Sequence, residues 1–263
     1  MTAPALPRET DEFLTYLRDV RQLSPHTLAN YRRDLASFSD FCTGQGAAHS
    51  DAVDEAHIRQ WVSARHRRGL AGSSIQRALS AVRSFFNYLN REHRRQHNPA
   101  AAVQAPRQGR RLPKTLDADQ VGKYLNFTDD SPLARRDRAI AELFYSCGLR
   151  LSELASIDRV DIDQHSRLVT VVGKGKRART VPVGGIALDA INRWLDCREE
   201  LARPELARDA LFVSQRGSRL SARSIQARLR LQGRLAGMPQ DVHPHMLRHS
   251  FASHMLESSG DLR

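Results

Sequence analysis

The sequence has few cysteines and no long apolar run. Its three cysteines, Cys42, Cys147 and Cys197, are widely spaced and form no CxxC pair. That pattern argues against a disulfide framework or a cysteine zinc site and is typical of reduced thiols in a cytosolic protein. No stretch approaches the roughly 20 apolar residues that span a bilayer. Residues 1–12 mix proline, arginine and acids, without the apolar core of a secretory signal. We therefore expect a cytoplasmic protein.

Acidic residues are also scarce relative to basic ones. The 263 residues include 41 Lys and Arg against 29 Asp and Glu, a net charge of +12. A surplus of this size favours a polyanionic partner, because each neutralised phosphate releases condensed counterions. Charge alone does not separate nucleic acid from an anionic membrane surface. Arginine, which binds phosphate bidentately, greatly outnumbers lysine, although an arginine bias can also follow genome composition.

The first 106 residues read as a helical bundle with a basic surface. Ser24 followed by Pro25 is a helix start, because serine caps the free N–H groups and proline fits the first turn. A second helix is expected after Gly72, and a shorter one lies around residues 58–62. Arginines between the apolar positions are candidates for DNA contact: Arg32, Arg33, Arg77 and Arg83.

Residues 107–111 read as a basic linker, and residues 112–263 as a second, mixed domain. The linker contains Arg110 and Arg111, two further DNA-binding candidates; the alternative is a surface loop within one domain. The pattern predicts strands at 167–172 and 180–183 around a glycine-rich turn, with helices at 138–147, 186–201, 221–236 and from 245 onward. The fold class is mainly α with a small β-hairpin. The remaining DNA-binding candidates are Lys176, Arg177, Arg223 and Arg228.

The first chemistry-bearing segment runs from Cys147 to Leu154. Gly148 allows a sharp turn, so Arg150 is expected near the start of a helix, where backbone N–H groups also favour anions. Glu153, one turn later, is placed to hold the guanidinium. Taken alone, the segment also fits an ordinary surface Arg–Glu pair.

The second segment is the turn at Lys174, which two glycines flank. A lysine at the tip of a hairpin can reach a phosphate or a leaving oxygen. The signal is weak by itself, because lysine and glycine are common in solvated turns. It is not a P-loop, since the spacing is wrong and a strand follows in place of a helix.

The third segment begins at His243. In a helix starting near His245, the side chains of His245, Arg248 and His249 share one face, whereas Leu247, Phe251 and Met255 share the other and should be buried. An imidazole beside a guanidinium suits a phosphodiester, since one moves a proton and the other neutralises an oxygen. Two rival interpretations are zinc binding by the two histidines and a merely structural polar face. HExxH is absent and no carboxylate completes the set, so no metal or other cofactor is expected.

Together, these segments resemble the tyrosine recombinase (phage integrase) family. The resemblance rests on Gly-Leu-Arg-x-Ser-Glu-Leu from Gly148, Gly-Lys-Gly from Gly173, and His-x-Leu-Arg-His-Ser-Phe-Ala from His245. Residues 242–263 are similar to the Xer subfamily. Other segments, such as Leu23-Ser24-Pro25 and Arg136-Asp137-Arg138-Ala139, are similar to its XerC group more than to its XerD group. The similarity extends over essentially the whole chain.

The resemblance implies roles for individual residues. Arg150 and Arg248 would clamp the phosphate, Lys174 would assist the leaving 5′ oxygen, and His245 would complete the catalytic set, with Glu153 and His249 as supports. The family's nucleophilic tyrosine would lie beyond Arg263, so the catalytic domain is expected to lack its C-terminal part and this chain to bind DNA without cleaving it.

The resemblance also implies a fold and a biological setting. A SAM-like core-binding domain would join a tyrosine-recombinase catalytic domain, together forming a clamp around double-stranded DNA. Strand exchange would pass through a 3′-phosphotyrosyl intermediate. A XerD-like partner recombinase in a heterotetramer and a DNA translocase regulator would take part in chromosome dimer resolution and segregation at cell division.

Two other classes of function fit some of the same residues. A non-catalytic DNA-binding or architectural protein would use the same basic faces. A metal-dependent nuclease is disfavoured, because the sequence has no cluster of carboxylates to hold its metal ions.

Overall fold

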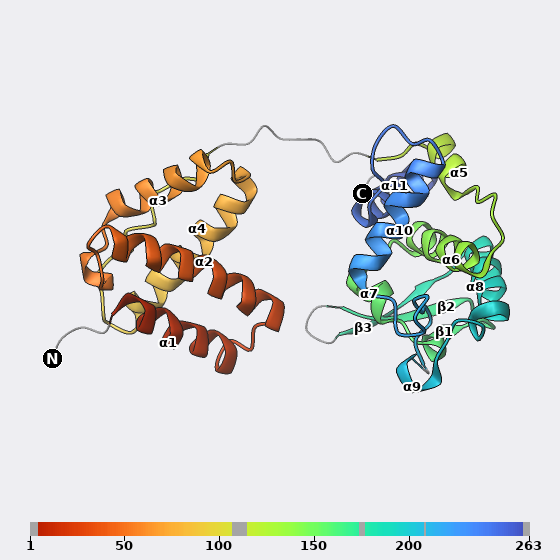
Figure 1. The fold of residues 1–263 in the computed structure, drawn as a ribbon, viewed down its shortest axis with the longest axis horizontal. Helices are drawn as coiled ribbons and strands as arrows, with labels where there is room; N and C mark the ends of the chain where they lie inside the picture. The colour runs from red at the N-terminus through yellow and green to blue at the C-terminus, as the bar shows by residue number, and fades with distance from the viewer. Residues whose placement is uncertain (1–4, 107–114, 174–176, 208, 260–263) are drawn as a thin grey trace. The chain divides into compact units, whose positions relative to one another are not determined.

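The computed structural model describes residues 5–106, 115–173, 177–207 and 209–259. The chain divides into two compact units, residues 1–111 and 112–263. Each unit has its own hydrophobic core. Figure 1 shows the helices and strands of both units. No helix in the described ranges is long and apolar enough to cross a membrane.

The first unit is a bundle of helices. These are α1 (Leu6–Asp19), α2 (Pro25–Gly44), α3 (Glu55–Arg67) and α4 (Gly72–Arg91), with a short 3-10 turn, η1 (Ser50–Ala52). As expected, Ser24 caps α2, and its side chain accepts a hydrogen bond from the backbone N–H of Thr27. Sequence analysis did not predict α1. It contributes Leu6, Phe13, Leu14 and Leu17 to a core rich in aromatic rings.

The second unit combines helices with one small sheet. The helices are α5 (Ala118–Leu125), α6 (Pro132–Cys147), α7 (Leu151–Ser156), α8 (Gly185–Arg198), α9 (Pro204–Ala207), α10 (Ala222–Leu235) and α11 (Pro244–Ser259), with a 3-10 turn, η2 (Arg159–Asp161). The strands are β1 (Ile162–Asp163), β2 (Leu168–Val172) and β3 (Ala178–Pro182). The expected hairpin is β2–β3, and sequence analysis missed α5, α9 and β1.

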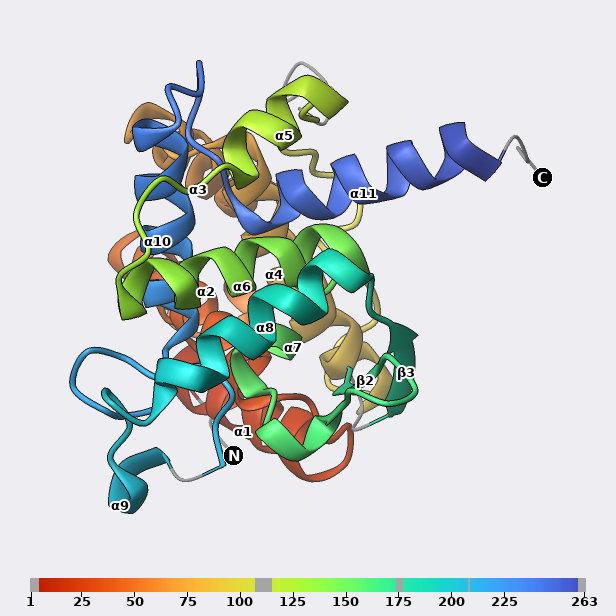
Figure 2. The same ribbon diagram turned by 90° about the vertical axis from the view of Figure 1, so that its right-hand side faces the viewer.

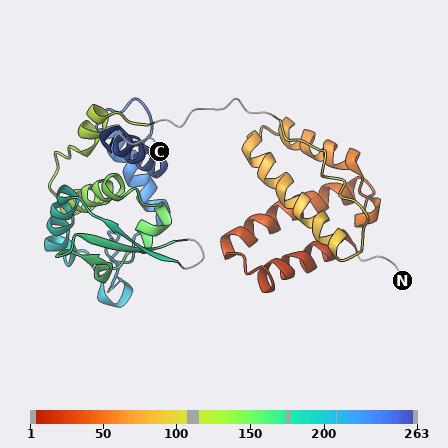
Figure 3. The same ribbon diagram turned by 180° about the vertical axis from the view of Figure 1, so that it is seen from behind.

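The three strands form an antiparallel sheet in the order β1-β2-β3, which lies on one side of the second unit (Figure 3). Val169 pairs with Val181, and Val171 pairs with Arg179. Because side chains alternate along a strand, paired residues point to the same face. Val169 and Val171 are buried, so Arg179 also points toward the interior of the unit.

Helices α6 and α8 lie side by side through the core of the second unit (Figures 1 and 2). Trp194 of α8 is fully buried, and its indole N–H donates to the carbonyl of Leu211. The first turns of α11 bury Met246 and Leu247 in the same core.

One prediction for α11 was wrong. Met255 was expected on a buried face, but it is 54% exposed. The helix runs outward from the unit (Figure 2), so its later turns leave the core that covers Leu247. Helical periodicity identifies which residues share a face, but not how far a neighbouring element extends along it.

Candidate active site

The chain reverses direction between α6 and α7 at Gly148, which places Arg150 immediately before α7. Gly148 has the left-handed φ of 54° and ends α6 by donating its N–H to the carbonyl of Phe144. Arg150 is 54% exposed at its side chain, so its guanidinium can meet a ligand. Glu153 is almost fully buried, at 1% exposed, and both its oxygens face this turn.

Glu153 holds Arg150 at two points. Its Oε2 accepts from the backbone N–H of Arg150 at 2.8 Å, and its Oε1 accepts from Nη1 of the same residue at 2.8 Å. The expected Arg150–Glu153 contact is therefore present, and it is more than a surface ion pair, because the carboxylate is buried.

A third residue, Arg179 of β3, completes this network and was missed by sequence analysis. Its Nη1 and Nη2 donate to Oε1 and Oε2 of Glu153 at 2.6 and 2.8 Å. Burial alone would raise the pKa of Glu153. The hydrogen bonds from Arg179 and Arg150, together with the charge of Arg179, outweigh that effect and lower the pKa to about 2.

The depressed pKa of Glu153 predicts a pH-dependent stability of the second unit. An unfolded glutamate titrates near its ordinary pKa of about 4.3. The folded unit therefore gains stability from the ionised carboxylate above this pH and loses it as the pH falls toward 2. Glu153→Gln should remove that part of the acid sensitivity.

The measurement is denaturant unfolding of wild type and Glu153→Gln between pH 2.5 and 7. At neutral pH we expect the variant to be less stable by about 1–3 kcal/mol, because two half-exposed guanidinium groups lose a charged acceptor. Asp241→Asn serves as the control for an exposed carboxylate of the same unit. Parallel pH profiles for wild type and Glu153→Gln would contradict the prediction.

The base of the β2–β3 hairpin lies against this network. The N–H of Gly173 donates to the carbonyl of Arg177 at 2.8 Å, which closes the described base of the turn. A side-chain carbon at position 173 would lie 3.5 Å from Nη1 of Arg179 and 3.6 Å from Oε1 of Glu153. Lys174 and Lys176 lie outside the described residues, and their proposed roles rest on their place in the sequence, one and three residues after Gly173.

The third segment occupies the start of α11. His245 and His249 are exposed and Arg248 is half-buried. Nη1 of Arg248 donates to the carbonyl oxygen of Gly148, two residues before Arg150. Burial lowers the pKa of the nearby His243, and the positive charge of His245, His249 and Arg230 lowers it further.

The three motif segments therefore lie next to one another. Glu153 binds Arg150 and Arg179, Gly173 lies against the Glu153–Arg179 pair, and Arg248 bonds to Gly148. The geometry brings guanidinium groups and exposed imidazoles to one part of the second unit. Such a set can neutralise an anionic oxygen and move a proton.

The DNA-binding candidates fall into two groups. Arg32, Arg177 and Arg223 are exposed. Four others have protein partners: Arg33 bonds to Asn30, Arg77 to Asp34, Arg83 to the carbonyls of Ala100 and Val103, and Arg228 to Asp137. Arg110 and Arg111 lie outside the described residues, as does Lys176.

Arg83 is an arginine whose guanidinium binds backbone carbonyls of the same unit. Its Nε donates to the carbonyl of Ala100 at 3.0 Å and its Nη2 to that of Val103, so its guanidinium fastens the segment after α4 to the bundle. Its proposed DNA contact remains a prediction, but the carbonyls already occupy much of its donor capacity.

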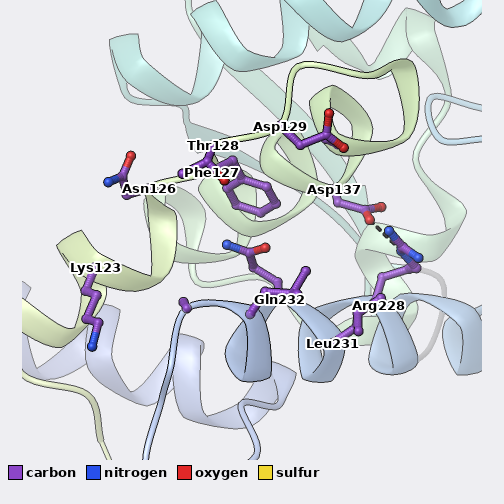
Figure 4. Close-up of a pocket in the computed structure, with 12 residues that line it drawn as sticks. Lys123, Asn126, Phe127, Thr128, Asp129, Asp137, Arg228, Leu231 and Gln232 are labelled. Carbon is purple, nitrogen blue, oxygen red and sulfur yellow. Dashed lines mark hydrogen bonds and ion pairs between the residues drawn. The ribbon is translucent and has the colours of Figure 1, made fainter.

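A cavity of about 510 Å³ lies apart from the arginine and histidine set, between the α5–α6 connection and α10 (Figure 4). Gln232, Phe127 and Arg228 line it, with Arg228 bound to Asp137. None of its lining residues belongs to the three motifs. Within the described ranges, no group of three or more His, Cys, Asp and Glu side chains is arranged as metal ligands would be.

The two units match two sequence families. Residues 114–263 match the phage integrase family, and residues 10–93 match the phage integrase N-terminal SAM-like domain. Proteins named tyrosine recombinase XerC from Pseudomonas entomophila and Xanthomonas axonopodis are each 48% identical to this chain. The alignments cover 98% and 96% of this chain, respectively, and 85% of each relative.

Solved structures share the fold at lower identity. The Tn1549 transposon integrase in complex with transposon right end DNA has a TM-score of 0.81 and 17% identity, covering 98% of this chain and 88% of that one. XerH site-specific recombinase bound to its difH substrate has a TM-score of 0.75 and 19% identity, covering 97% of this chain and 75% of that one. The resemblance and the fold class are confirmed: this chain belongs to the phage integrase family of tyrosine recombinases.

Proposed function

We propose that this member of the phage integrase family is a XerC-like site-specific recombinase that cuts and rejoins double-stranded DNA. The observation that carries the proposal is the contact chain in which Glu153 holds Arg150 and Gly148 holds Arg248. It joins two arginines from distant segments at an accessible part of the second unit. In this proposal, residues 1–106 form the core-binding domain, residues 107–111 the linker and residues 112–263 the catalytic domain, which together clamp DNA.

Each group would have a defined role at the reacting phosphodiester. Arg150 and Arg248 would bind non-bridging oxygens and stabilise the charge that develops on them. Lys174 would donate a proton to the leaving 5′ oxygen, and His245 would hold or move a proton nearby. Attack by a tyrosine would conserve the phosphodiester as a 3′-phosphotyrosyl bond, and a 5′-hydroxyl of another strand would reverse the step.

The names of the relatives support a proposal for the biological setting. Proteins called tyrosine recombinase XerC are 48% identical over nearly the whole chain. We therefore propose a role in chromosome dimer resolution and segregation at cell division, in a heterotetramer with a XerD-like partner. Control by a DNA translocase, and a cytoplasmic location, belong to the same proposal.

None of the five tyrosines in residues 1–263 has the setting of an activated nucleophile. Tyr16, Tyr31 and Tyr88 belong to the first unit, whose core they contact. Tyr124 is fully buried, and its hydroxyl donates to the carbonyl of Leu229. The hydroxyl of Tyr145 lies 3.0 Å from Nδ1 of His254, and burial together with Glu142 raises its pKa. A raised pKa opposes ionisation, so we propose that none of these residues attacks DNA.

The polypeptide of residues 1–263 should therefore bind duplex DNA without forming a covalent adduct. Binding should weaken steeply with added salt, because the arginines act by releasing counterions from the phosphates. The measurement combines gel-shift titrations at several salt concentrations with denaturing gels on a nicked suicide duplex. A slow-migrating covalent band would show that one of the five tyrosines does attack, and the absence of any DNA binding would refute the recombinase assignment.

The alternative function is that of a non-catalytic DNA-binding protein. It also predicts that none of the five tyrosines attacks DNA. A purely architectural DNA-binding protein would form no adduct even when a nucleophilic tyrosine in the family's position is supplied. A recombinase would form one, and its activity would survive the chelator EDTA. Loss of cleavage with EDTA would instead indicate a metal-dependent nuclease.

A further inference from the structure

We infer that Arg179 is a positioning residue of the proposed recombination site, which fixes the carboxylate of Glu153 and through it the guanidinium of Arg150. The inference rests on the proposed function, because it assigns a purpose to a contact within the same site. Arg179 lies on β3, outside the motif segments that carry the family resemblance.

The pairing register aims Arg179 at Glu153. Its strand partner, Val171, is buried, so both residues point toward the interior of the unit. Its guanidinium meets the carboxylate edge to edge, with one N–H on each oxygen at 2.6 and 2.8 Å. Such a bidentate pair fixes the plane of the carboxylate as well as its position.

Each oxygen of the Glu153 carboxylate accepts two hydrogen bonds. Oε1 accepts from the side chains of Arg150 and Arg179, and Oε2 accepts from the backbone N–H of Arg150 and from Arg179. Without Arg179, each oxygen would keep one donor, both from Arg150. A carboxylate at 1% exposure would then lack the charge that compensates for its desolvation.

Arg150 needs this support because its own side chain is 54% exposed. An exposed guanidinium on a flexible stem samples many rotamers, and its single side-chain bond to Glu153 orients it only if the carboxylate is itself held. Arg179 holds the carboxylate from β3, whereas Glu153 and Arg150 lie at α7. Gly173 lies against the same pair, which places the base of the hairpin and the Arg150 turn on one shared contact.

The test compares Arg179→Ala and Arg179→Lys with wild type by NMR, without DNA. In wild type, the side-chain carboxyl carbon of Glu153 should titrate near pH 2. In Arg179→Ala its pKa should rise by one unit or more toward the ordinary value of about 4.3. The Arg150 side-chain resonances should broaden as rotation about its Nε–Cζ bond speeds up. Arg179→Lys should lie between, since lysine restores the charge but not the bidentate geometry.

Arg159→Ala is the matched control. Arg159 is 44% exposed in the same unit and pairs with Glu199 at 3.3 Å. Replacing it by alanine therefore removes a comparable surface charge. It should leave Glu153 and Arg150 unchanged. Circular dichroism of every variant confirms folding, and Arg179→Lys keeps the test informative if Arg179→Ala unfolds.

The second readout uses a version of the protein that carries a nucleophilic tyrosine. Arg179→Ala should slow cleavage of a suicide duplex by roughly 10–100-fold, as loss of an outer orienting contact does in other sites, while half-saturation with DNA changes little. An unchanged Glu153 pKa and Arg150 line shape in Arg179→Ala would overturn the inference, as would wild-type cleavage. If wild type itself fails to cleave, the proposed function fails, while the NMR result still decides whether Arg179 orients Arg150.

Discussion

Replacing Arg150 or Arg248 by alanine, in a version that carries a nucleophilic tyrosine, is expected to lower the rate of strand cleavage by roughly 10²–10³-fold. DNA affinity should fall much less. Each arginine would meet one phosphate among the many that contact a basic protein of net charge +12, so the bound ground state loses little. The transition state loses a preorganised donor at the oxygen where charge develops.

Lysine should not replace either arginine. The guanidinium of Arg150 serves both Glu153 and, as proposed, a phosphate, and one ammonium lacks the planar fork for both. Arg248 is half-buried and bonded to the carbonyl of Gly148. Arg248→Lys can keep that single contact or reach the phosphate, so we expect it to be as slow as Arg248→Ala.

Single-turnover cleavage and gel-shift titration on the same duplex separate these effects. Arg159→Ala again provides the control, because Arg159 pairs with Glu199 on the surface. Equal losses of affinity and rate in Arg150→Ala or Arg248→Ala would identify that arginine as an ordinary anchoring residue rather than part of the phosphate clamp.

Local sequence patterns predicted elements of both units, among them ones that carry the site. Ser24 followed by Pro25 marked the start of α2, and the branched residues of 168–172 marked β2, because capping and strand preference depend on adjacent residues. Gly148 was expected to turn the chain before Arg150, and its φ of 54° is a left-handed conformation that glycine adopts without steric cost. These features require no knowledge of the tertiary fold.

The residues that were missed depend on long-range packing. Arg179 follows Lys176 and Arg177 in a basic run, and nothing near it in the sequence points to Glu153, 26 residues earlier. Asp34 and Asp137 are likewise buried carboxylates that bind Arg77 and Arg228. A count of charges treats all arginines as available to DNA, whereas the fold occupies several of them internally.

Gly148→Ala is expected to destabilise the second unit by about 2–5 kcal/mol. A left-handed conformation costs an L-residue about 1–2 kcal/mol, and overpacking a buried site typically costs about 1–3 kcal/mol more. The added methyl carbon would lie 2.5 and 2.8 Å from Cδ1 and Cε1 of Phe251, distances that force the ring of α11 to move. Gly148 is buried, so the methyl group has no route to solvent.

Urea unfolding of the second-unit transition measures this loss, and Gly122→Ala is its matched control. Gly122 lies within α5 with open space where a methyl group would be, so alanine there should be neutral or stabilising by about 0.4–1 kcal/mol. A Gly148→Ala protein as stable as wild type would show that α6 and α7 can join through a different backbone path.

The double variant Gly148→Ala/Phe251→Leu separates the two costs. Leucine lacks Cε1, and its Cδ1 is a methyl group that can turn away from the new methyl group, so the steric part should be relieved while the backbone strain remains, and the two substitutions should be non-additive. Cleavage adds a further distinction in a tyrosine-containing version. The carbonyl of Gly148 anchors Arg248, so a shifted turn should slow cleavage even in the double variant that regains stability. Recovery of both stability and cleavage rate in that variant would mean that the clash with Phe251, rather than the left-handed turn, sets the position of Arg248.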